Sequence, residues 1–254
     1  MTRYACRMLL LLAVWLEYSG SAHAQGNVPR WLIDGPTAGM LPAGRLAVDL
    51  RLYGDSGMLS QIEVGVHNRI SIGISFGGQH IVGSREAAWN PRVEVAGRVR
   101  VIEEELKVPA VAVGYHSQGY GEYDGNLNRY EVKSKGFYAV ASKNYGFPLG
   151  DMGLHAGLNR SLEDGDGDVD LSGFLGADVE FKRIFAMLVE YDFAINDNED
   201  NSLGSGRGRL NLGGRWMPSE RLNLEVDVKN LFRDGKRSKN IDRQVRLVYY
   251  SKVW

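Results

Sequence analysis

The residues of this sequence that could do chemistry lie in short polar stretches, and one of these is rich in aspartate. Four carboxylates alternate there with glycine and valine, at Asp164, Asp166, Asp168 and Asp170. Several carboxylate oxygens on a flexible turn are the ligands that Ca²⁺ prefers. The stretch departs from the EF-hand pattern, because Val169 occupies the glycine position and Leu175 stands where the bidentate glutamate belongs. We therefore predict a solvated hairpin tip with no metal or other cofactor, and keep loose divalent-cation binding as the alternative.

A second candidate is the pair His116 and Ser117, since serine and histidine together can form a nucleophile and its base. His155 is a further candidate base. A barrel hydrolase acting on lipid or surface peptide would need His116 or His155 within hydrogen-bond reach of a serine or carboxylate at a rim. No nucleophile elbow, metal-ligand spacing or phosphate-binding loop accompanies these residues. We predict that the protein is not an enzyme, with the hydrolase as the alternative.

Three tyrosines form the third candidate, in a glycine-rich stretch that interrupts two alternating segments. They are Tyr115, Tyr120 and Tyr123. Aromatic faces suit the apolar faces of sugar rings, so these residues predict a possible sugar-contacting loop. The competing interpretation is an ordinary cluster of interfacial tyrosines.

The composition and the first residues restrict where such chemistry could take place. A formal net charge of −1 over 254 residues leaves no positive excess for binding nucleic acid. Residues 1–24 predict a secretory signal peptide, because Arg3 and Arg7 precede a short apolar run and small residues follow at 22–24. The run is too short for a membrane anchor, which needs ~20 apolar residues. The only cysteine, Cys6, lies in this segment, so we expect an exported chain without disulfides or thiol chemistry.

A lead at residues 25–44 separates the predicted signal peptide from the rest of the chain. It contains three prolines and shows no periodicity, apart from one small apolar cluster formed by Trp31, Leu32 and Ile33. The sequence leaves open whether this lead is a periplasmic tether or a plug inside a barrel.

Residues 45–254 show the period-two alternation of β-strands with two distinct faces. Twelve strands are expected: at 45–53, 60–66, 69–76 and 92–102, two within 108–143, and at 152–159, 171–181, 184–193, 208–216, 221–228 and 243–254. The sixth would run from Tyr130 to Lys143, with a bulge at Gly136 where the alternation slips by one residue. A soluble sandwich that binds a ligand would show the same alternation.

The connections between these strands sort by length. Short turns follow the even-numbered strands and longer polar loops follow the odd-numbered ones, except for the short first connection at residues 54–57. Outer-membrane barrels have short periplasmic turns and long external loops in this way. An even strand count places both termini in the periplasm. We therefore predict an all-β, closed antiparallel up-and-down barrel in the cell outer membrane, in contact with lipid.

The polar parity of the strands predicts the lining of the lumen. A charge on the lipid face near the midplane costs ~2–4 kcal/mol for Lys or Arg, so the charged parity must face inward. The residues concerned are Asp49, Arg51, Glu63, Glu94, Arg98, Arg100, Asp178, Glu180, Glu190, Asp192, Arg209, Arg215, Glu225 and Asp227. Both signs occur in similar numbers, which indicates cross-strand salt bridges filling a narrow interior and not a strongly ion-selective pore.

Several stretches of the chain resemble the YjbH-like outer-membrane proteins, a family linked to exopolysaccharide production. The similar stretches are residues 35–42, 108–121, 130–143, 155–159 and 190–192. The resemblance implies an outer-membrane barrel and, as partners, polysaccharide or export machinery. The family proteins are considerably longer than this chain, and they bring no catalytic residues to carry over. From the sequence we expect a porin-like barrel or an accessory to the export of envelope polysaccharide.

Overall fold

Alternating side chains place each strand with one face outward and one face inward. The fold is seen in a computed structural model that describes residues 29–236 and 240–254. In the first strand, Leu46, Val48 and Leu50 are half-buried on the outer face, whereas Asp49 and Arg51 are buried on the inner face. The predicted signal peptide lies outside the described residues.

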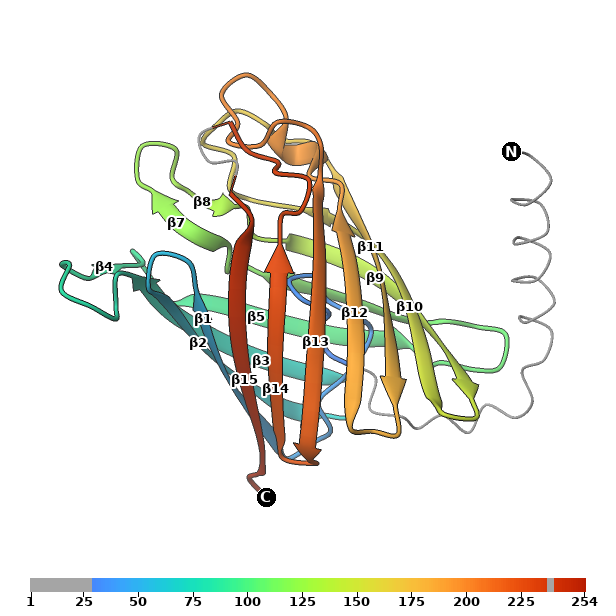
Figure 1. Ribbon diagram of the computed structural model, residues 1–254. Helices are drawn as coiled ribbons and strands as arrows, with labels where there is room; N and C mark the ends of the chain where they lie inside the picture. Colours follow the sequence, from blue (N-terminus) through green and yellow to red (C-terminus); the bar gives the residue numbers. More distant parts are fainter. Residues whose placement is uncertain (1–28, 237–239) are drawn as a thin grey trace, which may run out of the picture.

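Twelve long strands form the wall of the molecule (Figure 1). They are β1 (Arg45–Tyr53), β2 (Gly57–His67), β3 (Ile70–Gln79), β5 (Glu94–Ile102), β6 (Ala110–His116), β9 (Gly136–Phe147), β10 (Gly150–Arg160), β11 (Ser172–Phe181), β12 (Phe185–Asp192), β13 (Arg209–Ser219), β14 (Leu222–Lys229) and β15 (Asp242–Lys252). Each pairs antiparallel with its neighbours along the chain. The sheet closes because β1 pairs with β15, with Arg45 opposite Lys252. The predicted closed antiparallel barrel is confirmed, and the alternative of a soluble sandwich is wrong.

Three further elements are short, and the first of them pairs with the end of β3. They are β4 (Ala88–Trp89), the hairpin of β7 (Tyr120–Asp124) with β8 (Arg129–Val132), and the 3₁₀ helix η1 (Ile195–Asp197). All three lie in the long connections. These connections gather at the end of the barrel opposite the C-terminus, as Figure 1 shows. The short turns at 68–69, 148–149 and 220–221 lie at the C-terminal end. The sorting of connections by length is therefore confirmed, and the C-terminal end is the periplasmic end.

The sixth strand differs from its prediction. Its expected first part, from Tyr130 to Val132, belongs instead to β8 and pairs with β7 in a separate two-stranded sheet. The chain then leaves the ladder at residues 133–135 and re-enters the wall at Gly136 with φ +59°. A bulge does lie there, because Arg160 opposes both Gly136 and Phe137. The slip in alternation thus marks a change of sheet as well as a bulge, which a period-two pattern cannot distinguish.

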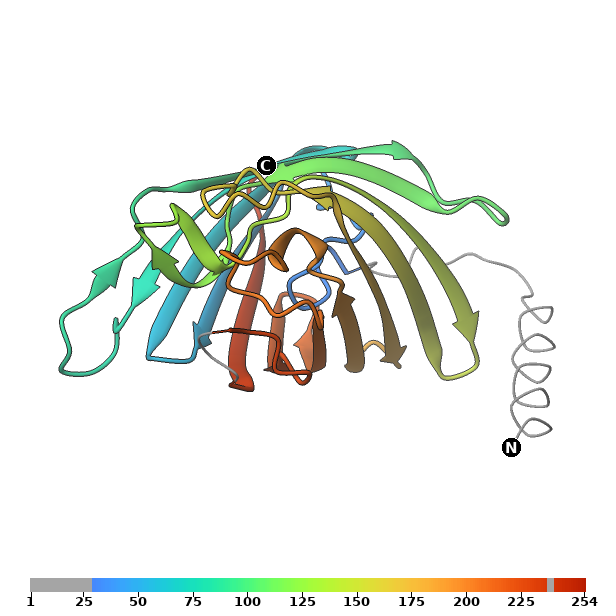
Figure 2. The same ribbon diagram turned by 90° about the horizontal axis from the view of Figure 1, so that it is seen from above.

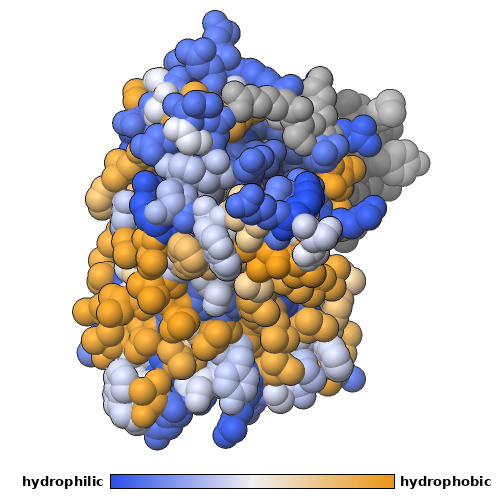
Figure 3. Space-filling view, turned by 90° about the vertical axis from the view of Figure 1, so that its left-hand side faces the viewer, coloured by the Kyte–Doolittle hydropathy of each residue, from blue (hydrophilic) through white to orange (hydrophobic). Residues whose placement is uncertain are grey.

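A belt of exposed apolar side chains surrounds the wall. Examples from different strands are Ile72 at 55 % exposed, Met187 at 58 % and Val226 at 55 %. One side of this belt is visible in Figure 3, below a hydrophilic upper end. Exposed apolar surface on this scale marks a membrane or protein interaction surface, and a closed barrel satisfies its backbone groups without water, as a membrane requires. The chain is therefore an outer-membrane barrel. Among the described residues, no helix is long and apolar enough to cross a membrane.

Candidate functional site

Residues 30–42 run inside the barrel, and we call this segment the plug. Seen from above in Figure 2, it lies within the ring of strands. Trp31 is 3 % exposed, and Leu32 and Ile33 are fully buried. The segment doubles back on itself, because the N–H of Leu32 donates to the carbonyl of Gly35 and the N–H of Thr37 donates to that of Arg30. The sequence left open whether residues 25–44 form a periplasmic tether or a plug, and the described part of this lead lies inside the barrel as a plug.

Apolar contacts seat the tip and the return of the plug against the wall. Leu32 and Ile33 pack with Leu188 of β12. A Cβ atom added at Gly176 would lie 2.2 Å from Leu32 Cδ1, so the absence of a side chain there makes room for Leu32. Farther along the plug, Ala38 belongs to a buried cluster with Phe174.

Glu190 holds the tip of the plug through three consecutive backbone groups. Its Oε2 accepts hydrogen bonds from the N–H groups of Ile33 at 3.1 Å, Asp34 at 2.9 Å and Gly35 at 2.7 Å. Its other oxygen accepts from Asn211 Nδ2 at 3.1 Å. A carboxylate that accepts several N–H groups forms bonds about twice as strong as neutral ones. Glu190 therefore anchors the tip of the plug through charge-assisted hydrogen bonds.

Arginines of the wall donate to the carbonyl groups of the plug. Arg98 Nη1 donates to the carbonyls of Arg30 and Gly39, both at 2.8 Å. Arg215 Nη2 donates to the carbonyl of Trp31 at 3.0 Å. Arg51 Nη1 donates to Asp34 Oδ1, also at 3.0 Å. The wall thus supplies donors for the plug's carbonyl oxygens and acceptors for its N–H groups, so a buried non-helical segment keeps its backbone satisfied.

Arg246 connects the first and last strands beneath the plug. Its Nε donates to Asp49 Oδ2 at 2.7 Å, and its Nη1 lies 3.5 Å from both Glu225 Oε1 and the carbonyl of Leu32. Arg246 is not among the charged residues predicted to line the lumen. In the structure Arg246 and Val248 are buried, whereas Leu247 is exposed, so β15 alternates regularly through this stretch.

Most of the 14 charged residues assigned to the lumen are buried, and the rest, Arg100 and Glu180, are half-buried. Those in contact with the plug are Arg51, Glu63, Arg98, Arg100, Glu190 and Arg215. Others pair within the wall or with the loops: Asp49 and Glu225 with Arg246, Glu94 with Arg92, Asp178 with His155, Asp192 with Lys135, Arg209 with Asp197, and Asp227 with Gln244. Glu180 lines the periplasmic mouth. The interior is a dense network of ion pairs around the plug.

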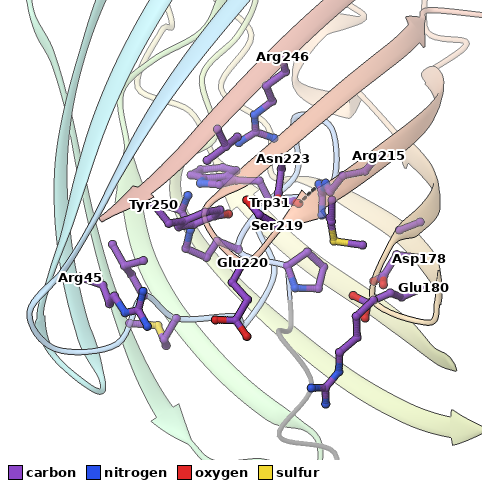
Figure 4. Close-up of a pocket in the computed structure, with 18 of the residues that line it drawn as sticks. Trp31, Arg45, Asp178, Glu180, Arg215, Ser219, Glu220, Asn223, Arg246 and Tyr250 are labelled. Atoms are coloured by element: carbon purple, nitrogen blue, oxygen red, sulfur yellow. Dashed lines mark hydrogen bonds between the residues drawn. The ribbon is translucent and has the colours of Figure 1, made fainter. Parts of the chain in front are cut away.

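Two cavities open on opposite sides of the plug. The inner cavity, at the periplasmic end, has a volume of about 350 Å³ and is lined by Trp31, Arg215 and Arg246 among others (Figure 4). The outer cavity, beneath the external loops, has a volume of about 510 Å³ and is lined by Asp34 and Tyr120 among others. Since Trp31 borders one cavity and Asp34 the other, the tip of the plug separates the two mouths.

Comparison with known proteins bears on the fold of this barrel. No protein-family model and no curated protein matches the chain. Among solved structures, one of a KdgM porin in complex with disordered oligogalacturonate is similar, with a TM-score of 0.51 and 8 % identity over 81 % of this chain and 98 % of that one. A NanC porin gives a TM-score of 0.44 and 12 % identity over 82 % of this chain and 98 % of that one. An outer membrane channel from Pseudomonas putida F1 gives 0.46 and 11 %, over 86 % of this chain and 100 % of that one. At these identities the likeness shows the fold, which is the porin-type barrel of the first of these structures.

The aspartate-rich stretch is part of a buried ionic network that ties the external loops together. Arg129 Nη1 pairs with Asp166 Oδ2 at 2.5 Å and with Asp197 Oδ1 at 2.6 Å. Asp168 Oδ2 accepts from Asn198 N at 3.0 Å. Asp164 and Asp170 are not buried. Within residues 29–236 and 240–254 no group of three acidic, histidine or cysteine side chains could hold a metal ion, and two of the four candidate carboxylates serve to position loops.

Glu163, in the same loop region, gives the loops a dependence on pH. Its Oε2 accepts from the N–H of Tyr130 at 3.1 Å, and its Oε1 has no partner among the described residues. Burial raises the pKa of Glu163 from 4.5 to about 7. A carboxyl group with a raised pKa stabilises the fold fully below its ordinary pKa, and this contribution is lost as the pH rises through the folded value.

We therefore expect the external loops to loosen between about pH 5 and pH 8, by an amount on the order of 3 kcal/mol. In Glu163→Gln this dependence should disappear, because the amide stays neutral while still accepting from Tyr130. Amide hydrogen exchange of residues 129–132, corrected for intrinsic rates, measures the effect. Equal loosening in both proteins would contradict the assignment.

The histidines do not form a site at a rim. His116 packs against Trp31 with ring centroids 4.7 Å apart, and its ring nitrogens have no partner in the described part of the chain. His155 does contact a serine and a carboxylate, Ser142 Oγ and Asp178 Oδ1, both at 2.8 Å. All three side chains are buried beneath the plug, and Ser142 Oγ accepts from Ala38 N at 2.8 Å. The group holds the plug and exposes no nucleophile.

The three tyrosines separate in the structure. Tyr115 packs against Phe137, which is 59 % exposed on the outer face of the wall. Tyr120 and Tyr123 belong to the β7–β8 hairpin and line the outer cavity. Two other tyrosines, Tyr130 and Tyr138, are buried. Of the three candidate tyrosines, only Tyr120 and Tyr123 line a cavity that a ligand could enter.

Proposed function

We propose that this protein is a non-enzymatic, porin-like channel of the outer membrane that the plug holds closed. The observation that carries this proposal is the pair of cavities, of about 350 and 510 Å³, separated by the tip of the plug. Removing residues 30–42 would join the two cavities through a lumen lined with charged side chains. Such a lumen suits polar solutes.

The attachment of the plug allows it to leave without disturbing the wall. It is joined to β1 by only two residues, Ala43 and Gly44, and Arg45 already pairs with β15 at the periplasmic end. Pro29 lines the inner cavity, so both ends of the plug lie at the same mouth. Many of its contacts with the wall are hydrogen bonds and ion pairs, which water can replace. Withdrawal toward the periplasm therefore breaks no strand pairing.

An accessory role in polysaccharide export is the second candidate, and it rests on the resemblance to the YjbH-like proteins. The observation that favours it is the position of Tyr120 and Tyr123 at the outer cavity, where sugar rings could stack. Export machinery as a partner remains part of this proposal. The amino-sugar probe described in the next subsection tests whether the outer cavity takes sugars.

Locking the plug tests the channel proposal. Because the only cysteine is Cys6, a disulfide between Ala38→Cys and Ser142→Cys would form without competing thiols in the mature chain. The two positions are joined by the Ala38 N to Ser142 Oγ hydrogen bond of 2.8 Å, which suits the short span of a disulfide. We expect the oxidised double variant to show no openings in planar lipid bilayers, and reduction to restore those of the wild type.

Deletion of residues 30–42 is the complementary variant. It should give steady ion conductance, because the tip of the plug lies between the two cavities. In the disulfide experiment, the single variants Ala38→Cys and Ser142→Cys serve as controls for the substitutions. A deletion variant that still shows the heat-dependent gel mobility of a closed barrel but conducts no ions would overturn the channel proposal.

A further inference from the structure

The outer cavity carries an excess of negative charge. Among residues 29–236 and 240–254, seven carboxylates and three basic side chains line it, an excess of four negative charges. Of the basic groups, Lys229 pairs with Asp34 of the same cavity at 2.5 Å, and Arg209 pairs at 2.5 Å with Asp197, which does not line the cavity. The cavity therefore repels anions and attracts cations.

Two of these carboxylates interact with the basic groups of Lys229 and Arg209 only at a distance. Glu131 of β8 and Asp242 at the start of β15 both line the cavity, and neither forms an ion pair within residues 29–236 and 240–254. Burial, and then the negative charge of Asp242, raises the pKa of Glu131. A cation placed between the two carboxylates would relieve this repulsion.

The cavity already contains an arrangement that recognises one alkylammonium group. The ammonium of Lys229 lies 4.7 Å from the centre of the Tyr120 ring and 2.5 Å from the carboxylate of Asp34. An aromatic face combined with a carboxylate is the usual environment of bound ammonium groups. Tyr120 is only 8 % exposed, and its hydroxyl has no hydrogen-bond partner in the described part of the chain. It is a buried polar group at the cavity that can accept a further N–H donor.

We propose that the outer cavity binds primary ammonium groups, carried by an aliphatic polyamine or by an amino sugar. Glu131 and Asp242 supply the counter-charges, the Tyr120 hydroxyl supplies a further acceptor, and Tyr123 supplies an aromatic ring at the cavity. The proposal deepens the channel function, on which it rests, by naming the chemical class of its cargo. An acidic oligosaccharide is the ligand that this cavity disfavours.

Calorimetric titration of the folded, detergent-solubilised protein tests the proposal. The probes are spermidine, a glucosamine trimer and, as the anionic comparison, a galacturonate trimer. At low salt we expect one or both amine probes to bind and the galacturonate not to bind. Binding of spermidine but not of the glucosamine trimer would identify polyamines as the carrier of the ammonium group. Binding of the trimer but not of spermidine would identify amino sugars. Binding should weaken at least tenfold in high salt, because the attraction between the charges is screened.

The double variant Glu131→Gln with Asp242→Asn should weaken amine binding by tenfold or more. Its matched control is Glu86→Gln with Glu105→Gln, which removes two exposed carboxylates that do not line the outer cavity. Heat-dependent gel mobility checks that each variant is folded. Amine binding that is unchanged in the double variant, absent in the wild type, or weaker than galacturonate binding would overturn the proposal.

The same titrations on the protein locked between residues 38 and 142 separate this proposal from the channel proposal. Binding to the locked form needs no open lumen, so a barrel that never conducts could still bind amines at its outer cavity. Conversely, conductance without amine binding would leave the channel function standing and remove this inference alone.

Discussion

The variant Glu190→Ala is expected to open the barrel. In the wild type, the carboxylate of Glu190 accepts hydrogen bonds from the N–H groups of Ile33, Asp34 and Gly35. Hydrogen bonds to a charged group contribute about 1.5–3 kcal/mol each. Even if water restores much of this energy, a loss of about 3 kcal/mol would raise the population of the open state more than a hundredfold. Single-channel recording should show this as a large rise in the fraction of time spent open.

Two further variants sharpen this test. Glu190→Gln keeps a neutral acceptor and should lie between the wild type and Glu190→Ala. Glu220→Ala removes an exposed carboxylate at the inner mouth, and no hydrogen bond joins this residue to the plug among the described residues. Its open fraction should match that of the wild type. If Glu190→Ala stayed closed while folded, the plug would have to be held by its apolar contacts instead.

The variant Arg129→Met should be the most damaging change in the external loops. The guanidinium is fully buried between Asp166 and Asp197, and removing one partner of a buried ion pair costs about 3–5 kcal/mol. Burial opposes the charge of Asp197, but the guanidinium groups of Arg209 and Arg129 outweigh it and lower the pKa of Asp197 to about 2. The loops should therefore become sensitive to protease in the variant while the barrel remains closed.

The pH dependence of this loss identifies its cause. In the wild type, the contribution of Asp197 is present above its ordinary pKa of 3.8 and is lost as the pH falls through about 2. Without Arg129 the pKa of Asp197 should rise, so mild acid should restore part of the protection. Arg207→Met, at an exposed position of the same loops, is the matched control and should change little. If Arg129→Met and Arg207→Met were equally sensitive to protease, the loss of the buried Arg129 contacts could not be the cause of the loosened loops.

The wall could be predicted from the sequence because its rules are local. A lipid face and a lumen face alternate residue by residue, so Leu46, Val48 and Leu50 are sufficient to orient β1. Loop lengths then gave the direction of each strand. The prediction failed where a local pattern had two structural causes, as at Gly136, where a bulge coincides with a change of sheet.

The plug could not be predicted in this way. Its contacts join positions far apart in the chain, such as Ile33 with Glu190 and Trp31 with Arg215. Nothing periodic in residues 30–42 indicates which of these pairs form. The Ser142–His155–Asp178 group shows the same limit, since only the fold reveals that it lies under the plug and not at a rim.

The seam between β1 and β15 also determines the order in which this molecule can be assembled. Arg45 opposite Lys252 is a pairing between the first and the last strand of the barrel, and a pairing over so long a separation carries a large loop-closure cost. Arg246 bridges that seam to Asp49 and reaches Leu32 at the same time. The cylinder therefore cannot be completed until its final strand has been synthesised and delivered. Once β15 has paired with β1, the side chain of Arg246 contacts both the seam, at Asp49, and the plug, at Leu32.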